Sequence, residues 1–207
     1  ASDVYKRQGL RILAAAAVLT FGCLTMNAYA AEGWALSNNI WTYLDKNGNR
    51  VTNEWKKGAD NLWRYLNNSG EMAVNSWADN DYYVDANGIM VADKWMQIVS
   101  PYSRDSQTYW FYFGSSGKVT KDTWKKIDGK SYYFDSDGIM QTGWTEDGDY
   151  YLSSSGAMVT GWRYLEPKDE DSSLYGTESD DGKYWFYFSA SGKKQSPSTS
   201  DDGGEYK

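Results

Sequence analysis

The chain has 207 residues, with 21 Lys and Arg against 28 Asp and Glu, and it contains one Cys and no His. The absence of His excludes catalysis by Ser-His-Asp or Cys-His groups, and a single Cys excludes a disulfide framework and a Cys-rich zinc site. A formal net charge of -7 argues against nucleic acid as a partner, because neutralising phosphates needs a basic face. We therefore expect no catalytic residue, no metal and no cofactor. The 11 Trp and 18 Tyr indicate that aromatic side chains do more than fill a core.

The first thirty residues have the pattern of a secretory signal peptide. The first eight fit nothing that follows and are left out of the fold prediction. Three basic residues then precede or flank an apolar run from Ile12 to Met26, which is shorter than the roughly 20 residues that span a membrane. The run leads to Ala28-Tyr29-Ala30, a small-x-small pattern that predicts cleavage after Ala30. We therefore expect an exported protein without a stable membrane span after cleavage.

From Trp34 onward one motif is repeated about seven times. Each copy has a Tyr followed five residues later by Gly, and in the first six copies a Trp comes six or seven residues after that Gly. An apolar residue follows each Tyr, and Asp, Asn or Ser precede the Gly, which is the composition of a hairpin turn. A repeat of roughly 20 residues predicts an all-β solenoid of stacked β-hairpins. The Tyr/Gly pairs are Tyr43/Gly48, Tyr65/Gly70, Tyr83/Gly88, Tyr112/Gly117, Tyr133/Gly138, Tyr151/Gly156 and Tyr187/Gly192.

Strand alternation assigns the faces of each predicted hairpin. Side chains alternate along a strand, so each repeat Tyr shares a face with the residue two positions before it. This residue is Trp in four copies and Asp or Ser in three. A core position would not readily exchange Trp for Asp, so we expect this face to be partly open. The seven residues are Trp41, Trp63, Asp81, Trp110, Ser131, Asp149 and Trp185.

Two stretches carry a resemblance to a known family. Residues Ile139-Met140-Gln141-Thr142-Gly143-Trp144 and Ala157-Met158-Val159-Thr160-Gly161-Trp162 resemble the Gly-x-Met-x-Thr-Gly-Trp end of the cell-wall-binding repeat, also called the choline-binding repeat. Similar repeats occur in the glucan-binding domains of bacterial glucansucrases. The resemblance covers about residues 34–194. It implies a left-handed β-solenoid with ligand pockets between successive hairpins.

The resemblance also implies which residues form those pockets. Each pocket would combine the Trp of Gly-Trp, the Trp of Trp-Tyr-Tyr and an aromatic residue of the next hairpin. The three sets are Trp34, Trp41 and Tyr65; Trp55, Trp63 and Tyr83; and Trp95, Trp110 and Tyr133. The alternative is that these rings form the core between hairpins; we favour the core for the Tyr and a ligand for Trp41, Trp63 and Trp110. The copies with Asp81, Ser131 and Asp149 depart from the pattern and are better suited to a sugar.

These observations together predict the organisation and function of the chain. We expect a signal peptide at residues 1–30, a repeat domain at 31–194 and a polar tail at 195–207. The expected protein is a secreted, non-catalytic module at the wall of a Gram-positive bacterium. It would attach to choline-bearing teichoic acid or to a bacterial or extracellular glycan. Alternatives are the attachment part of a larger wall hydrolase or glucansucrase, and a spacer that binds neither ligand.

Overall fold

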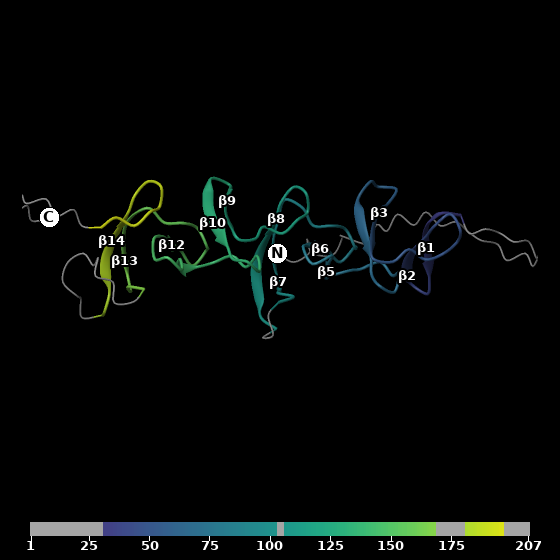
Figure 1. Ribbon diagram of the computed structural model, residues 1–207, viewed down its shortest axis with the longest axis horizontal. Coiled ribbons are helices and arrows are strands. Elements are labelled where there is room, and N and C mark those ends of the chain that lie inside the picture. Colours follow the sequence, from purple (N-terminus) through teal and green to yellow (C-terminus); the bar gives the residue numbers. More distant parts are fainter. Residues whose placement is uncertain (1–30, 103–105, 169–180, 197–207) are drawn as a thin grey trace, which may run out of the picture.

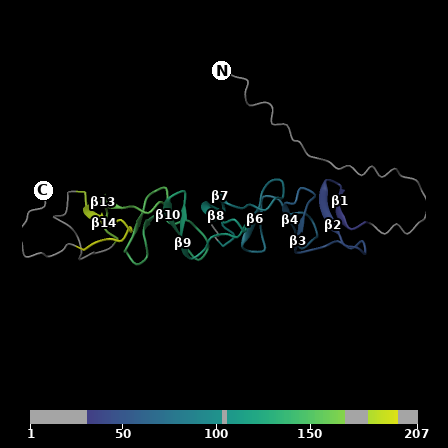
Figure 2. The same cartoon turned by 90° about the horizontal axis from the view of Figure 1, so that it is seen from above.

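The chain folds into a row of β-hairpins. The computed structural model describes residues 31–102, 106–168 and 181–196, and within them it contains seven two-stranded antiparallel sheets and no helix, so no membrane-spanning helix is found there. The hairpins follow one another in chain order along one axis (Figure 1), and the same order is seen from above (Figure 2). The all-β hairpin-repeat prediction is confirmed. The predicted signal peptide and residues 197–207 of the predicted tail lie outside the described residues.

Each sheet pairs two strands that are adjacent in the sequence. The pairs are β1 (Gly33–Ser37) with β2 (Ile40–Leu44), β3 (Glu54–Lys57) with β4 (Trp63–Leu66), β5 (Ser76–Ala78) with β6 (Tyr82–Val84), β7 (Lys94–Val99) with β8 (Thr108–Phe113), β9 (Thr123–Ile127) with β10 (Lys130–Phe134), β11 (Gly143–Trp144) with β12 (Tyr151–Leu152), and β13 (Gly161–Leu165) with β14 (Tyr184–Phe188). A two-stranded hairpin is marginally stable by itself in water. The contacts between consecutive hairpins must therefore supply much of the stability.

The register places aromatic residues opposite one another in every hairpin. The first Trp of the repeat lies directly across from the repeat Tyr, as in Trp34 and Tyr43 or Trp124 and Tyr133. In the seven hairpins the centroids of these two rings lie 5.1–5.8 Å apart, in edge-on or tilted arrangements. Such geometries are the favourable ones for aromatic pairs. The Trp and the Tyr thus form one aromatic face on each hairpin, as strand alternation predicts.

A backbone hydrogen bond joins each hairpin to the next unit. The N–H of the residue two positions after the turn Gly donates to the carbonyl of the residue two positions before the Tyr of the preceding hairpin. The donor and acceptor pairs are Met72 and Trp41, Met90 and Trp63, Val119 and Asp81, Met140 and Trp110, Met158 and Ser131, and Lys194 and Asp149, at 2.7–2.9 Å. Because the acceptor is a backbone carbonyl, the side chain at that position can be Trp, Asp or Ser without loss of the bond.

Methionine and glycine pack against each other between consecutive units. A Cβ atom placed on Gly117 would lie 2.6 Å from Cε and Sδ of Met90, and Gly117 has φ +79°. Gly88 stands in the same relation to Met72, Gly156 to Met140 and Gly192 to Met158. The repeated Gly-x-Met spacing therefore reflects a contact from one unit to the next, in which the Met occupies the space that a side chain on the following Gly would need.

The residue after the repeat Tyr forms the core. In the last six hairpins this residue is fully buried, with no exposed surface. These residues are Leu66, Val84, Phe113, Phe134, Leu152 and Phe188. Full burial of a side chain of this size contributes about 1.5–3 kcal/mol. The hydrophobic core is thus distributed along the axis, with one apolar side chain from each unit.

The Met–Gly contact generates a test of stability. Gly117→Ala should lower the free energy of unfolding more than Gly129→Ala does. Both glycines have a positive φ, +79° and +81°, so the two variants carry a similar backbone cost. Only the methyl group at position 117 must displace Met90, whereas nothing lies within 4 Å at position 129. We expect a difference of about 1 kcal/mol or more in urea unfolding followed by Trp fluorescence. Equal destabilisation would contradict the packing role of Met90.

Candidate functional site

The first Trp of each hairpin meets the next hairpin through one particular position. This position, the middle residue, directly precedes the repeat Tyr, and strand alternation points it away from its own Trp and Tyr. Ring centroids across these interfaces lie 4.9–5.4 Å apart for Trp55 and Tyr82, Trp77 and Phe111, Trp95 and Tyr132, Trp124 and Tyr150, and Trp144 and Phe186. In the second hairpin the middle residue is Arg64. Each interface is named below by its first Trp.

The third residue of each predicted pocket is a repeat Tyr. In the sequence this Tyr comes directly after the middle residue. Tyr65, Tyr83 and Tyr133 were expected to reach back to the preceding hairpin. Instead, their rings contact the first Trp of their own hairpins, Trp55, Trp77 and Trp124. Tyr82 and Tyr132 are the residues whose rings contact the preceding hairpin, and Arg64 holds the equivalent position in the second hairpin. Strict use of strand alternation across the interface would have identified them from the sequence.

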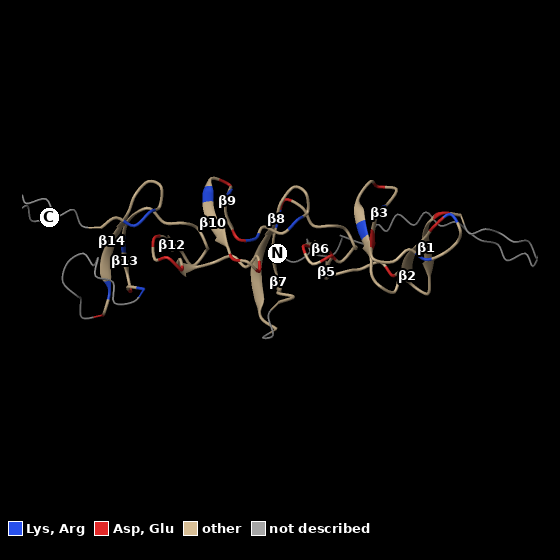
Figure 3. Cartoon of the chain, viewed as in Figure 1, with Lys and Arg blue, Asp and Glu red and all other residues tan. Residues whose placement is uncertain are grey.

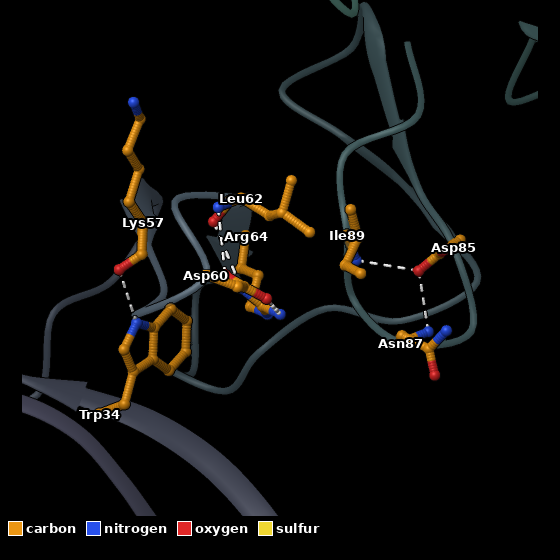
Figure 4. A network of polar contacts seen from close by, with 8 residues as sticks. All are labelled: Trp34, Lys57, Asp60, Leu62, Arg64, Asp85, Asn87 and Ile89. Carbon is orange, nitrogen blue, oxygen red and sulfur yellow. Dashed lines mark hydrogen bonds and ion pairs between the residues drawn. The ribbon is translucent and has the colours of Figure 1, made fainter. Parts of the chain in front are cut away.

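Three interfaces are closed by a hydrogen bond from the indole. Nε1 of Trp34, Trp77 and Trp144 donates to the backbone carbonyl of Lys57, Val99 and Glu166 at 2.9, 2.9 and 2.8 Å. Figure 4 shows the first of these bonds. We call these three the hydrogen-bonded interfaces, and their middle residue is Arg or Phe. Here the Trp serves to join one hairpin to the next.

The other three interfaces have a Tyr as their middle residue. These tyrosine interfaces are those of Trp55, Trp95 and Trp124, with Tyr82, Tyr132 and Tyr150. In the described part of the chain, no hydrogen bond of Nε1 is found for these three Trp. Their rings are therefore positioned by aromatic contacts alone, and the indole N–H is not committed to the protein backbone.

Cationic side chains of the protein occupy the Trp34 interface. Nζ of Lys56 lies 5.1 Å from the centroid of the Tyr43 ring. The guanidinium of Arg64 is held by two bonds to the carboxylate of Asp60, at 2.9 and 2.7 Å (Figure 4). This hydrogen bonding lowers the pKa of Asp60 to about 2, so the pair stays ionised. A cation of the protein thus lies beside the ring that Trp34 contacts, and the set of Trp34, Trp41 and Tyr65 stays a prediction.

The second Trp of the predicted pockets is accessible in two hairpins. Trp63 and Trp110 are 41% and 42% exposed, while Trp41 is half-buried. Trp110 lies edge-on to Trp95, with ring centroids 6.3 Å apart, so the structure brings two members of the third predicted set together. The ring of Trp63 carries Nζ of Lys57 at 4.9 Å from its centroid. The expectation that this face is partly open is met at Trp63 and Trp110.

Two cavities lie at neighbouring interfaces. The first, of about 370 Å³, is bounded by three rings and the turn between β11 and β12. Its lining residues are Trp124, Tyr133, Tyr150, Thr145, Glu146 and Asp147. The second, of about 430 Å³, lies beside Trp144 and Tyr151 and includes Lys168 and Lys183 in its lining. The family pattern predicts no pocket at Trp124, because Ser131 stands where the pattern has Trp.

The acidic residues at the variable position are engaged in ion pairs. The carboxylate of Asp81 lies 3.1 Å from Nζ of Lys118 and 2.9 Å from Nζ of Lys121, and Asp149 lies 3.0 Å from Nζ of Lys193. Hydrogen bonding from Lys121 holds the pKa of Asp81 below its usual value. These ion pairs join neighbouring units through Asp81 and Asp149.

Charges are spread along the whole row of hairpins. Figure 3 shows basic and acidic residues distributed over the length of the described hairpins. Among the described residues, no three His, Cys, Asp or Glu side chains come together in a way that could hold a metal ion.

Comparison with known proteins places these features in a family. A model of the choline-binding repeat matches residues 31–77 and 119–161. Among solved structures, the modular autolysin LytC from Streptococcus pneumoniae is 27% identical with a TM-score of 0.54, over 79% of this chain and 38% of that chain. CbpJ from Streptococcus pneumoniae is 27% identical with a TM-score of 0.53, over 79% and 48%. The chain thus spans less than half the length of these two relatives. A search of curated protein sequences gives no match.

The ion pairs of Asp81 generate a prediction about pH. Asp81→Asn should lower the free energy of unfolding at pH 7 by about 0.2–1 kcal/mol. Because the pKa of Asp81 is lowered in the folded state, its contribution is present above the ordinary carboxyl pKa of 3.8 and is lost as the pH falls through the lowered value. The difference between wild type and variant in urea unfolding should therefore become smaller as the pH falls below 3.8. Asp137→Asn, in an exposed turn, is the control and should change little at pH 7 or in acid. A difference that persists undiminished in acid would exclude the ion pair as its cause.

Proposed function

Since the chain belongs to the cell-wall-binding repeat proteins of the choline-binding type, we propose that it is an attachment module whose tyrosine interfaces hold quaternary ammonium groups of a cell-surface polymer. The observation that carries this proposal is the cavity at Trp124. Three aromatic rings border it, and its lining contains carboxylates and no Lys or Arg. A choline-bearing teichoic acid is the polymer that fits this chemistry.

Aromatic rings suit this ligand because a quaternary ammonium has no N–H to donate. It is held by the negative faces of rings, each worth about 0.5–1 kcal/mol at exposed sites and about 2 kcal/mol when desolvated. Trp124 lies 5.3 Å from Tyr133 and 5.0 Å from Tyr150 between ring centroids, which leaves the three faces grouped at one place. Three such faces give a single-site affinity on the order of millimolar.

The hydrogen-bonded interfaces are less suited to a cation. At Trp34, Lys56 lies over the Tyr43 ring. At Trp144, Nζ of Lys194 lies 5.5 Å from the ring centroid, and the adjacent cavity is lined by Lys168 and Lys183. A ligand ammonium at either place would meet a like charge. We therefore assign ligand binding to the Trp95 and Trp124 interfaces, since at the Trp55 interface Nζ of Lys57 lies 4.9 Å from the centroid of the Trp63 ring, and we assign a structural role to the hydrogen-bonded interfaces.

Several weak sites on one chain suit a polymeric ligand. Linked sites raise the apparent affinity by roughly 10²–10⁴ when the ligand can reach them simultaneously. This supports a protein that is exported after removal of residues 1–30, binds at the cell surface through residues 31–194 and carries no catalytic group in its repeats. An alternative is the attachment part of a larger wall hydrolase, since LytC is a modular autolysin of which this chain spans 38%.

The assignment of the tyrosine interfaces is tested on a choline-derivatised resin. Trp124→Leu keeps an apolar side chain and removes the ring face, so it should be eluted at a lower concentration of free choline than wild type. Loss of one linked site should lower the apparent affinity by about tenfold. Adding Trp95→Leu should lower it further. Elution is compared after circular dichroism has verified that each variant is folded.

Trp162→Leu is the matched control. Trp162 occupies the same repeat position in the last described hairpin, and its side chain is 50% exposed. It should be retained like wild type. If Trp124→Leu and Trp162→Leu elute together, the Trp124 interface is not a ligand site. Retention of wild type on dextran and not on the choline resin would make a glucan the ligand instead of choline.

A further inference from the structure

The turn between β11 and β12 places two carboxylates beside the Trp124 cavity. Glu146 and Asp147 both belong to the lining of this cavity. The turn is fixed by a hydrogen bond of 2.9 Å from the N–H of Gly148 to the carbonyl of Thr145, and Gly148 has φ +71°. Asp147 accepts a bond of 2.5 Å from Oγ1 of Thr145 and one of 3.0 Å from the N–H of Asp149. The carboxylate of Asp147 is thereby held within the turn.

Glu146 differs from Asp147 in having an uncommitted carboxylate. Its backbone carbonyl accepts a bond from Nζ of Lys168, but no hydrogen bond or ion pair of its side chain is found in the described part of the chain. The residue is exposed and belongs to the wall of the cavity. Its side chain can therefore turn towards a bound cation without breaking a contact in the protein.

The charges around the cavity are mainly negative. The phenol of Tyr133 has a raised pKa, first because of burial and then because of the carboxylates of Asp122, Asp135 and Glu146. Lys168 is the opposing charge: it helps to lower the pKa of Asp147, although the hydrogen bond from Thr145 is the larger cause. Lys168 lines the neighbouring cavity of Trp144 and not this one. The cavity of Trp124 is thus acidic and that of Trp144 basic.

We infer that Glu146 is a specificity-determining residue of the Trp124 site, whose carboxylate strengthens the preference of the three rings for a positively charged ligand. This inference rests on the proposed function. The rings already favour a trimethylammonium group over a neutral tert-butyl group of the same size by cation–π attraction, and a carboxylate beside them adds to that preference. The carboxylate of Glu146 favours the cation, and it disfavours a ligand whose own phosphate lies close to the turn.

The inference is tested with two ligands of equal shape. Wild type and Glu146→Gln are titrated with choline and with its neutral tert-butyl isostere. Binding is followed by the indole N–H signal of Trp124 in an NMR spectrum, assigned by its loss in Trp124→Leu. Glu146→Gln should weaken choline binding by about fivefold, the effect of removing one nearby charge in a solvated site. Binding of the isostere should not change. High salt should weaken choline binding to wild type more than to the variant.

Asp137→Asn is the control for total charge. It removes the same unit of charge from an exposed turn of the preceding unit and should bind choline like wild type. Equal choline affinity of Glu146→Gln and Asp137→Asn overturns the inference while the proposed function stands. An equal loss for choline and the isostere also overturns it, because the effect would then be one of shape. A wild type whose Trp124 signal does not respond to choline overturns the proposed function at this site, and the inference with it.

Discussion

The backbone hydrogen bond between consecutive units is the interaction on which the rest of the structure depends. It joins units at 2.7–2.9 Å in six places, always from the residue two positions after the turn Gly. Short two-stranded sheets bury too little to be stable alone, so each hairpin needs a neighbour in a fixed position. The bond fixes that position, and the Trp of one hairpin then meets the middle residue of the next. Each candidate site is a consequence of this junction, because its rings come from two hairpins.

The sequence predicts the repeat and its β-hairpins, but not the register of the strands. The Tyr-to-Gly spacing locates the turn that follows each Tyr, where only a single bridge such as that of Leu44 and Arg50 forms, whereas the paired strands are joined by the loop before the Tyr, which places Trp34 opposite Tyr43. The candidate site is predicted less completely. The ring contacts join Tyr65, Tyr83 and Tyr133 to the first Trp of their own hairpins, whereas Tyr82 and Tyr132 contact the Trp of the preceding hairpin. The family pattern requires the Trp of Trp-Tyr-Tyr, and Ser131 holds that position in the hairpin of Trp124. The pattern therefore predicts no pocket there.

Contacts between units could not be derived from spacing. Nothing in the sequence pattern shows that Asp81 pairs with Lys118 and Lys121, or that Lys56 lies over Tyr43. These pairings depend on which side chains the junction brings within a few ångströms, and the partners come from different repeats. They also change the chemistry of the interfaces. A ring face that is covered by the ammonium of a Lys is unavailable to a ligand cation. The same cation–π attraction therefore stabilises the protein at one interface and is available to a ligand at another.

The middle residue differs between the structural interfaces and the candidate ligand sites. It can change with little effect on the contacts that hold consecutive hairpins together. Phe111 and Phe186 offer only a ring, and the Trp before each of them bonds through Nε1 to the backbone. Tyr82, Tyr132 and Tyr150 occur where the indole makes no such bond. Because the junction is made by backbone atoms, and by Met against Gly, the exchange of Phe for Tyr leaves the spacing of the hairpins unchanged. Candidate sites and structural interfaces therefore lie in one continuous row of hairpins, which allows several weak sites on one chain to bind one polymer together.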